Sequence, residues 1–312
     1  MGKLVWNCQI ITPMFLHGIN QDIPEFRPPS LKGVMRYWWR AAQAEPDMQR
    51  LKQTEDRIFG DSGNEGKSKF SISIMVNNDQ LNRRPQKILP HHTGDRHCPY
   101  LPMCENRNNP GICSKGRSFQ AIVCPQHFQV IFRFGKLPEE FNEEHLQALF
   151  KLTALLGGLG KRSRRGFGSF SILSERIGDK EEEILNRILQ LLGIIAKGNY
   201  KIDKDENTSK HVIKLSKPCD ARYPFIRTIQ VGREYPHPFE LLKTIGKASH
   251  DHNDDSLGTV RQRMRFASPV YVSVVKSRDG YRPIITTLQM AFQDQTPRVD
   301  TEKQRLFKGA IL

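Results

Sequence analysis

Acidic side chains are scarce in this sequence relative to basic ones. The chain has 312 residues, with 33 Asp and Glu against 48 Lys and Arg, so its formal net charge is +15 and its pI is near 9.7. This imbalance predicts a polyanionic partner, with nucleic acid first and an acidic membrane surface second. A generally basic surface without a specific partner is the plainer alternative.

Long apolar runs are also missing. No stretch approaches the roughly 20 residues that cross a bilayer. Residues 1–11 lack the basic start and sustained apolar core of a secretory signal. We therefore expect a cytoplasmic protein without a membrane partner. Cysteine is sparse as well, and six cysteines do not force a disulfide scaffold on a chain of this size.

Signatures of mononucleotide and dinucleotide binding are absent, although the stretch at 157–170, "GGLGKRSRRGFGSF", is rich in glycine. A Walker A loop ends in Gly-Lys-Ser/Thr, whereas Gly160 and Lys161 are followed here by Arg162. A Rossmann turn runs from strand to helix, and this stretch is predicted to run from helix to strand. Neither kind of nucleotide site is expected.

The first half of the chain shows regular periodicity. Alternating or β-branched runs predict strands at 3–12, 69–76, 128–134 and 167–173, and helical spacing predicts helices at 31–44 and 141–156. Ser30 is the expected N-cap of the first helix, after an extended approach at Pro28 and Pro29. The order strand, helix, strand, strand, helix, strand is that of the split-βαβ, or ferredoxin-like, fold.

The second half repeats this mixture less regularly. It predicts helices at 180–197, ended by Gly198, and at 238–248, with strands at 223–231, 269–276 and 283–292. Exposed polar loops are expected at 203–210 and 250–256. We therefore predict an α+β protein of two ferredoxin-like (RRM-like) domains, at 1–177 and 178–312, with an inserted lobe at 77–127 that is too long for a hairpin loop.

The glycine stretch is the first candidate for RNA binding. Its glycines would let the chain approach a ligand backbone closely, while its cations would contact phosphates. The candidate residues are Gly158, Gly160, Lys161, Arg162, Arg164, Arg165, Gly166, Phe167 and Gly168. A flexible surface loop with solvated charges is the alternative.

The first predicted helix supplies the second candidate. Lys32, Arg36 and Arg40 recur every four residues and so share one stripe, on which Trp39 also falls. Such a row offers charges to phosphates and a ring to a base. Alternatively, the stripe is a solvated face, with Trp39 covered by a neighbouring lobe.

The inserted lobe carries a candidate metal site. Cys98, Cys104, Cys113 and Cys124 lie within it, with four histidines nearby, and such soft ligands could order the segment around zinc. No Cys-x-x-Cys pair is present, so free thiols or a disulfide remain alternatives. No cofactor other than this possible structural zinc is expected.

Two segments resemble the signatures of the RAMP superfamily of CRISPR proteins. These are "PEFRPPSLKGVMRYWWRAA" (24–42) and "LGGLGKRSRRGFGSF" (156–170), and "RMRFASPVYVSVV" (263–275) is similar to an Arg-x-Ala-Ser-Pro strand in the second half of such proteins. The first segment is most similar to first-numbered RAMP subunits of the type III-B, RNA-targeting Cmr complex. The resemblance covers residues 1–60 and 145–172 well and is patchy elsewhere.

The resemblance implies a non-catalytic RNA-binding subunit in antiviral defence. Its implied partners are guide RNA, target RNA and the other subunits of the Cmr effector complex. The alternative is a RAMP-type, metal-independent endoribonuclease that processes CRISPR RNA. The resemblance implies that guide-processing relatives often use a histidine, and that RNA-cleaving backbone subunits of type III complexes use an aspartate in the loop after the first strand. His17 and Asp22 both lie in that loop here. The sequence places no second titratable group to complete an acid–base pair, so no catalytic residue is expected.

Overall fold

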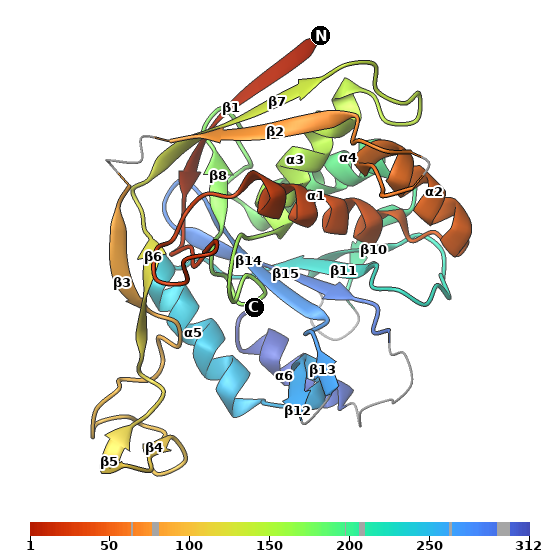
Figure 1. The fold of residues 1–312 in the computed structure, drawn as a ribbon. Helices are drawn as coiled ribbons and strands as arrows, with labels where there is room; N and C mark the ends of the chain where they lie inside the picture. Colours follow the sequence, from red (N-terminus) through yellow and green to blue (C-terminus); the bar gives the residue numbers. More distant parts are fainter. Residues whose placement is uncertain (64, 77–80, 197, 206–209, 262–263, 292–299) are drawn as a thin grey trace.

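Two antiparallel sheets enclose a layer of helices in the computed structural model (Figure 1). The structure describes residues 1–63, 65–76, 81–196, 198–205, 210–261, 264–291 and 300–312. The first sheet has the order β2 (Phe70–Met75), β7 (His127–Phe134), β1 (Gly2–Ile10), β8 (Phe170–Ile172). The second has the order β14 (Val270–Lys276), β15 (Tyr281–Leu288), β11 (Ile226–Val231), β10 (His211–Leu215), β9 (Tyr200–Lys204).

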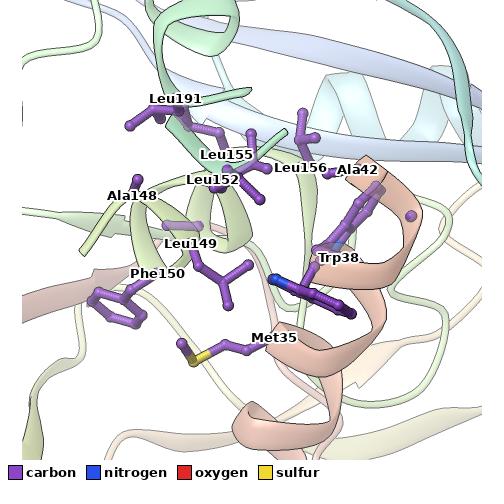
Figure 2. Packing of buried hydrophobic residues seen from close by; sticks show 14 of the residues in the cluster. Met35, Trp38, Ala42, Ala148, Leu149, Phe150, Leu152, Leu155, Leu156 and Leu191 are labelled. Atoms are coloured by element: carbon purple, nitrogen blue, oxygen red, sulfur yellow. The ribbon is translucent and has the colours of Figure 1, made fainter. Parts of the chain in front are cut away.

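The helices between the sheets are α1 (Pro28–Gln43), α3 (Glu143–Leu156) and α4 (Glu181–Ile195). Figure 2 shows Met35 and Trp38 of α1 beside the leucines of α3, with Leu191 of α4 next to Leu155. From Ala148 to Leu156, α3 is buried at every residue except Lys151. A helix that is apolar nearly all round is what a position between two sheets requires.

The strand β14 is buried on both of its faces. Tyr271 and Val275 join the core shared with the helix layer, whereas Val272 and Val274 join a second core. That second core lies under α5 (Pro238–Asp251) and α6 (Thr301–Gly309), which cover the outer face of the second sheet. Because the main core draws residues from both sheets, the two halves of the chain pack as one body.

The inserted segment forms an extended arm. Its base is the two-stranded ribbon of β3 (Arg83–Lys87) and β6 (Ser118–Ile122), and its tip holds the short pair β4 (Glu105–Asn106) and β5 (Asn109–Cys113) (Figure 1). The arm leaves the first sheet between β2 and β7 and descends along α5. The predicted lobe at 77–127 is therefore an arm, of which residues 77–80 lie outside the described residues.

The start of the first helix differs from its prediction. The N-cap is Arg27 rather than Ser30, and Pro28 and Pro29 occupy the first turn. Proline is well suited there, because its fixed φ is helical and its missing N–H would have had no partner.

Several elements were not expected from the sequence. They are α2 (Met48–Phe59), the arm strands β3 to β6, β9, β10, α6, the short hairpin of β12 (Thr259–Arg261) and β13 (Met264–Phe266), and a 3-10 turn at Asp255–Leu257. The start of α2 could have been predicted, because Asp is a favoured N-cap residue. Asp47 caps the helix by accepting hydrogen bonds from the N–H groups of Gln49 and Arg50.

The boundary expected near Ile177 falls between β8 and α4, and the division into domains stays a prediction. Parts of three predicted elements, at Lys197, 206–209 and Phe292, lie outside the described residues. Within the described part of the chain, no helix is long and apolar enough to cross a membrane.

Candidate nucleic-acid interface

The glycine stretch at 157–170 lies inside the fold instead of looping into solvent. It folds back on itself, and the N–H of Leu159 donates to the carbonyl of Gly168 over 3.0 Å. A Cβ on Gly168, where φ is +70°, would lie 2.0 Å from the Leu159 carbonyl oxygen. At Gly160, where φ is +93°, a Cβ would lie 2.4 Å from the carbonyl oxygen of Phe15. These glycines therefore serve close packing within the chain itself.

The other edge of the stretch joins the second sheet. The N–H of Gly166 donates to the carbonyl of Val272 over 2.8 Å, and the N–H of Val272 donates to the carbonyl of Arg164 over 3.2 Å. A Cβ on Gly166 would meet side chains of α5 and β14 at 3.0–3.2 Å. The stretch thus connects the two halves of the molecule.

Arg165 is an internal cation of this junction. Its guanidinium donates to the carbonyls of Arg164, Val270 and Leu257, each over 2.9 Å, and to the Ser268 hydroxyl over 3.1 Å. Burial, with the neighbouring Arg162 and Arg164 charges, lowers the pKa of Arg165 to about 9, so the side chain is still protonated at neutral pH. The Nη donors of Arg165 are thus used within the protein, and its predicted phosphate contact stays a prediction.

Arg164 is held at the same junction but reaches further out. It donates to the carbonyl of Ser268, and its guanidinium lies 5.4 Å from the ring centre of Tyr37 and 5.7 Å from that of Tyr271. Such stacking on aromatic faces fixes the planar group while leaving part of it accessible.

The remaining residues of the stretch divide into buried and accessible ones. Gly158 and Phe167 are buried, and the Phe167 ring packs 5.4 Å from that of Phe15. Lys161 is exposed and donates to the Gln21 side chain over 3.4 Å. Arg162 has a φ of +59°, and its Nε has no hydrogen-bond partner within the described residues. Lys161 is therefore the most exposed cation of this stretch, whereas Arg162 is half-buried and its unpartnered Nε is buried.

The basic row on α1 faces α2 rather than an open surface. Arg40 donates from Nε and Nη2 to the Glu55 carboxylate, both over 2.9 Å. Arg36 pairs with the same carboxylate, and with Asp56 over 3.0 Å. Glu55 and Asp56 of α2 thus pair with Arg36 and Arg40, two of the three cations of the row.

The other two members of the row are also engaged. Lys32 donates to the carbonyl of Phe70 over 3.3 Å and lies 5.1 Å from its ring centre. Trp39 is 4% exposed and packs edge-on against Phe59 of α2. In this structure α2 covers the Trp39 ring, and its predicted contact with a base stays a prediction.

A cleft of about 620 Å³ lies between the glycine stretch, the C-terminal part of α5 and the arm. Its cations are Lys115, Arg162, Arg164 and Arg165, and the described residues that line it include no Asp or Glu. His91, His92 and His250 complete one wall. Burial and neighbouring positive groups lower the pKa of His91 to about 3 and that of His92 to about 4, so both are neutral near pH 7.

Four neighbours of Arg162 were not predicted from the sequence, namely Lys115, His91, His92 and His250. They come from the arm and from α5, so only the folded chain brings them to the glycine stretch. The adjacent histidines at 91 and 92 were the one feature of the sequence that could have pointed to these neighbours.

Three of the four candidate zinc ligands meet at the tip of the arm. The sulfurs of Cys98, Cys104 and Cys113 gather with the ring of His92, whereas Cys124 is exposed and lies outside this group. Cys124 does not join the other three cysteines, because it follows β6 at the base of the arm. The zinc site itself stays a prediction.

His17 and Asp22 do not form an acid–base pair within the described residues. Asp22 is exposed, and its N–H donates to the Asn20 side chain. His17 is half-buried, its carbonyl accepts from Arg27 over 3.3 Å, and its Nδ1 has no hydrogen-bond partner among the residues that the structure describes.

The fold is a layer of helices between two antiparallel sheets, and a glycine-rich stretch joins the two halves of the chain. The RAMP superfamily model matches residues 7–171, and the chain belongs to that superfamily. It is similar to two Cmr subunits of Pyrococcus furiosus. Cmr1-1 is 27% identical, with 92% of this chain and 87% of the relative covered. Cmr1-2 is 26% identical, and the match covers 55% of this chain and 96% of that relative.

Solved structures share the fold at lower identity. The apo crystal structure of Cmr1 from Pyrococcus furiosus has a TM-score of 0.59 at 19% identity and covers 100% of this chain and 97% of that one. A chain in the cryo-EM structure of a type III-B Cmr-beta complex bound to cognate target RNA has a TM-score of 0.60 at 13% identity, with 99% of both chains covered.

Proposed function

We propose that this chain is a non-catalytic RNA-binding subunit of a type III-B CRISPR effector complex and acts in antiviral defence. Guide RNA, target RNA and the other Cmr subunits are its partners. Membership of the RAMP superfamily and the similarity to Cmr1 subunits support this proposal. The net charge of +15 agrees with a polyanionic ligand.

We further propose that both halves are ferredoxin-like. In the first half, the sheet order β2-β7-β1-β8 with crossovers through α1 and α3 is the order of a split-βαβ unit. In the second half, β11, α5, β14 and β15 repeat three strands of that order, and β10 takes the position of the fourth. These units correspond to residues 1–177 and 178–312.

The observation that carries RNA binding is the cleft beside Arg162. It gathers Lys115, Arg162 and Arg164 without a lining carboxylate, and the buried Nε of Arg162 has no hydrogen-bond partner, both statements holding for the described residues. Guanidinium groups match phosphate oxygens in geometry as well as in charge. The cleft therefore suits the sugar-phosphate backbone of a single strand, with binding that tolerates changes in base sequence.

The test is the affinity for guide-length single-stranded RNA of variants that remove one cleft charge. Arg162→Gln and Lys115→Gln should each weaken binding about five- to tenfold while leaving the melting temperature within about 1 °C. Lys136→Ala is the matched control, since Lys136 is an exposed cation beyond β7. If Arg162→Gln and Lys115→Gln bound RNA as tightly as the control Lys136→Ala, the cleft would be excluded as the RNA site.

The endoribonuclease alternative has its own test. Labelled RNA incubated with the protein in magnesium-free buffer should stay intact. Cleavage that disappears in His17→Ala or Asp22→Ala would instead favour the enzyme.

A further inference from the structure

The tip of the arm brings one imidazole nitrogen and three thiols together. The Sγ of Cys98 lies 3.5 Å from the Nδ1 of His92 and 3.5 Å from the Sγ of Cys104. The Sγ of Cys113 also lies 3.5 Å from the same Nδ1. All four ligand atoms lie within 4.8 Å of one another, and all four residues are buried.

These separations match the edges of a zinc tetrahedron. Zinc bonds of about 2.3 Å to sulfur and about 2.0–2.1 Å to nitrogen put ligands about 3.6 Å apart for S–N and about 3.8 Å apart for S–S. The observed S–N and S–S separations of 3.5 Å are close to both values. Three thiolates with one imidazole form a soft, four-ligand set that zinc accepts in structural sites.

The backbone around the four residues is shaped to bring them together. Gly94 and Gly116 cross so closely that a Cβ on Gly116 would lie 2.1 Å from the Cα of Gly94. This crossing places the two sides of the arm together next to the cluster. Within the cluster, the N–H of Leu101 donates to the carbonyl of Cys98 over 3.2 Å, which turns the chain tightly between its first two cysteines.

The other interactions described within the tip of the arm are few. Its separate apolar cluster consists of the three cysteines with Tyr100 and the half-buried Leu101, and the pair β4–β5 is short. So small an apolar cluster contributes little against the conformational entropy of the tip. Small segments of this kind are commonly stabilised by a metal, whose binding free energy becomes folding free energy.

We propose that His92 Nδ1 and the sulfurs of Cys98, Cys104 and Cys113 bind one structural Zn²⁺. On binding, the three thiols become thiolates and release their protons to solvent, so the loaded site carries a net charge of −1. Lys115 and Arg162 in the adjoining cleft balance that charge. With four protein ligands the coordination is complete, so the metal has no open position for catalysis.

The metal also fixes a wall of the cleft. His91, next to the ligand His92, lies so close to α5 that a Cβ on Gly246 would be 2.3 Å from its Nδ1. The Tyr100 ring, between two ligands in sequence, lies 4.0 Å from that of His250 of α5. Zinc therefore docks the tip of the arm on α5. An effect of zinc on RNA affinity follows only if the proposed RNA-binding function holds.

The test begins with metal analysis of full-length protein purified without chelators. We expect about one zinc per chain, and X-ray absorption should show three sulfur neighbours at about 2.3 Å and one nitrogen at about 2.0–2.1 Å. Cys104→Ser and His92→Ala should lose most of the zinc, and proteases should then cut residues 95–117 at least about tenfold faster. These measurements need no RNA, so their outcome is independent of the proposed function.

Matched variants keep the ligand assignment falsifiable. Cys124→Ser and His97→Ala change an exposed cysteine and an exposed histidine of the same segment and should retain zinc. Equal loss in Cys124→Ser and Cys104→Ser would overturn the ligand set. Protein that stays metal-free after dialysis against Zn²⁺, or that holds a Cys98–Cys104 disulfide when prepared without oxygen, would overturn the site.

Discussion

The guanidinium of Arg165 donates a hydrogen bond to the carbonyl oxygen of Val270, 2.9 Å away. This contact joins the glycine stretch after α3 to the first residue of β14, more than a hundred positions later in the chain. The stretch is therefore a structural joint whose outer cations face a cleft. Its residues divide between stability and ligand binding, and substitutions can separate the two roles.

Replacing Arg165 should cost stability. Arg165→Met keeps an apolar stem but takes the guanidinium donor away from the buried carbonyls of Leu257 and Val270, of which Val270 keeps the Ser268 hydroxyl as a donor. We expect the free energy of unfolding to fall by about 3 kcal/mol, measured by urea denaturation. Lys161→Ala, on the exposed part of the same stretch, should change it by less than about 0.5 kcal/mol. Equal unfolding midpoints for the two variants would contradict the internal position of Arg165.

Two glycines should respond in opposite directions to alanine. Gly168→Ala places a Cβ 2.0 Å from the Leu159 carbonyl oxygen at a φ of +70° and should destabilise the protein by several kcal/mol. Gly33 lies within α1, where an added Cβ would meet no group of the described residues within 4 Å, so Gly33→Ala should stabilise by about 0.5–1 kcal/mol. Thermal unfolding of the pair reports both signs in one experiment.

Substitutions at the basic row of α1 test whether its charges stabilise the fold or bind RNA. Glu55 is buried between Arg36 and Arg40, so Glu55→Ala should lower the free energy of unfolding by about 1–3 kcal/mol. Gln53→Ala, on the exposed side of α2, is the control. We expect Arg40→Gln to keep RNA affinity within about twofold. A larger loss of affinity, with stability unchanged, would restore the row as an RNA contact.

The thiols should differ in reactivity in the native protein. Cys124 is exposed and should be alkylated first. Cys8 is buried in the core and burial raises the pKa of its thiol, so it should react only after unfolding. Mass spectrometry after timed alkylation gives the order, with all six cysteines modified in denaturant as the reference. Early modification of Cys8 would contradict its position in the core.

RNA binding through the cleft should depend on salt. With about three phosphates contacted, the slope of log K against log[salt] for a single strand should be about −2. The double variant Arg162→Gln, Lys115→Gln should flatten it to about −1 and weaken different RNA sequences to similar extents. Fluorescence anisotropy across a KCl series measures both. A salt-independent affinity would rule out phosphate contacts as its source.

The sequence by itself determined the elements with strong periodicity. Strands β1, β2 and β7 and helices α1, α3 and α4 lie within a few residues of their predicted bounds, because alternation and helical spacing reflect which face each element buries. It also picked out the glycine stretch and three of the four residues gathered at the arm tip. The sequence did not predict α6 or the short strands β9 and β10, because short elements show too few repeats for their periodicity to be recognised.

Only the tertiary structure decided which charges are free and which ligands meet. Arg36 and Arg40 follow the same spacing whether they face solvent or acids, and the acids that pair with them lie on a separate helix, α2. Arg165 and Arg162 stand three positions apart in one basic run. Packing against β14 gives Arg165 a carbonyl partner at Val270, whereas the buried Nε of Arg162 has no partner among the described residues. His92 replaces Cys124 beside the other cysteines because the arm folds back on itself, and distance in space, not spacing along the chain, selects ligands.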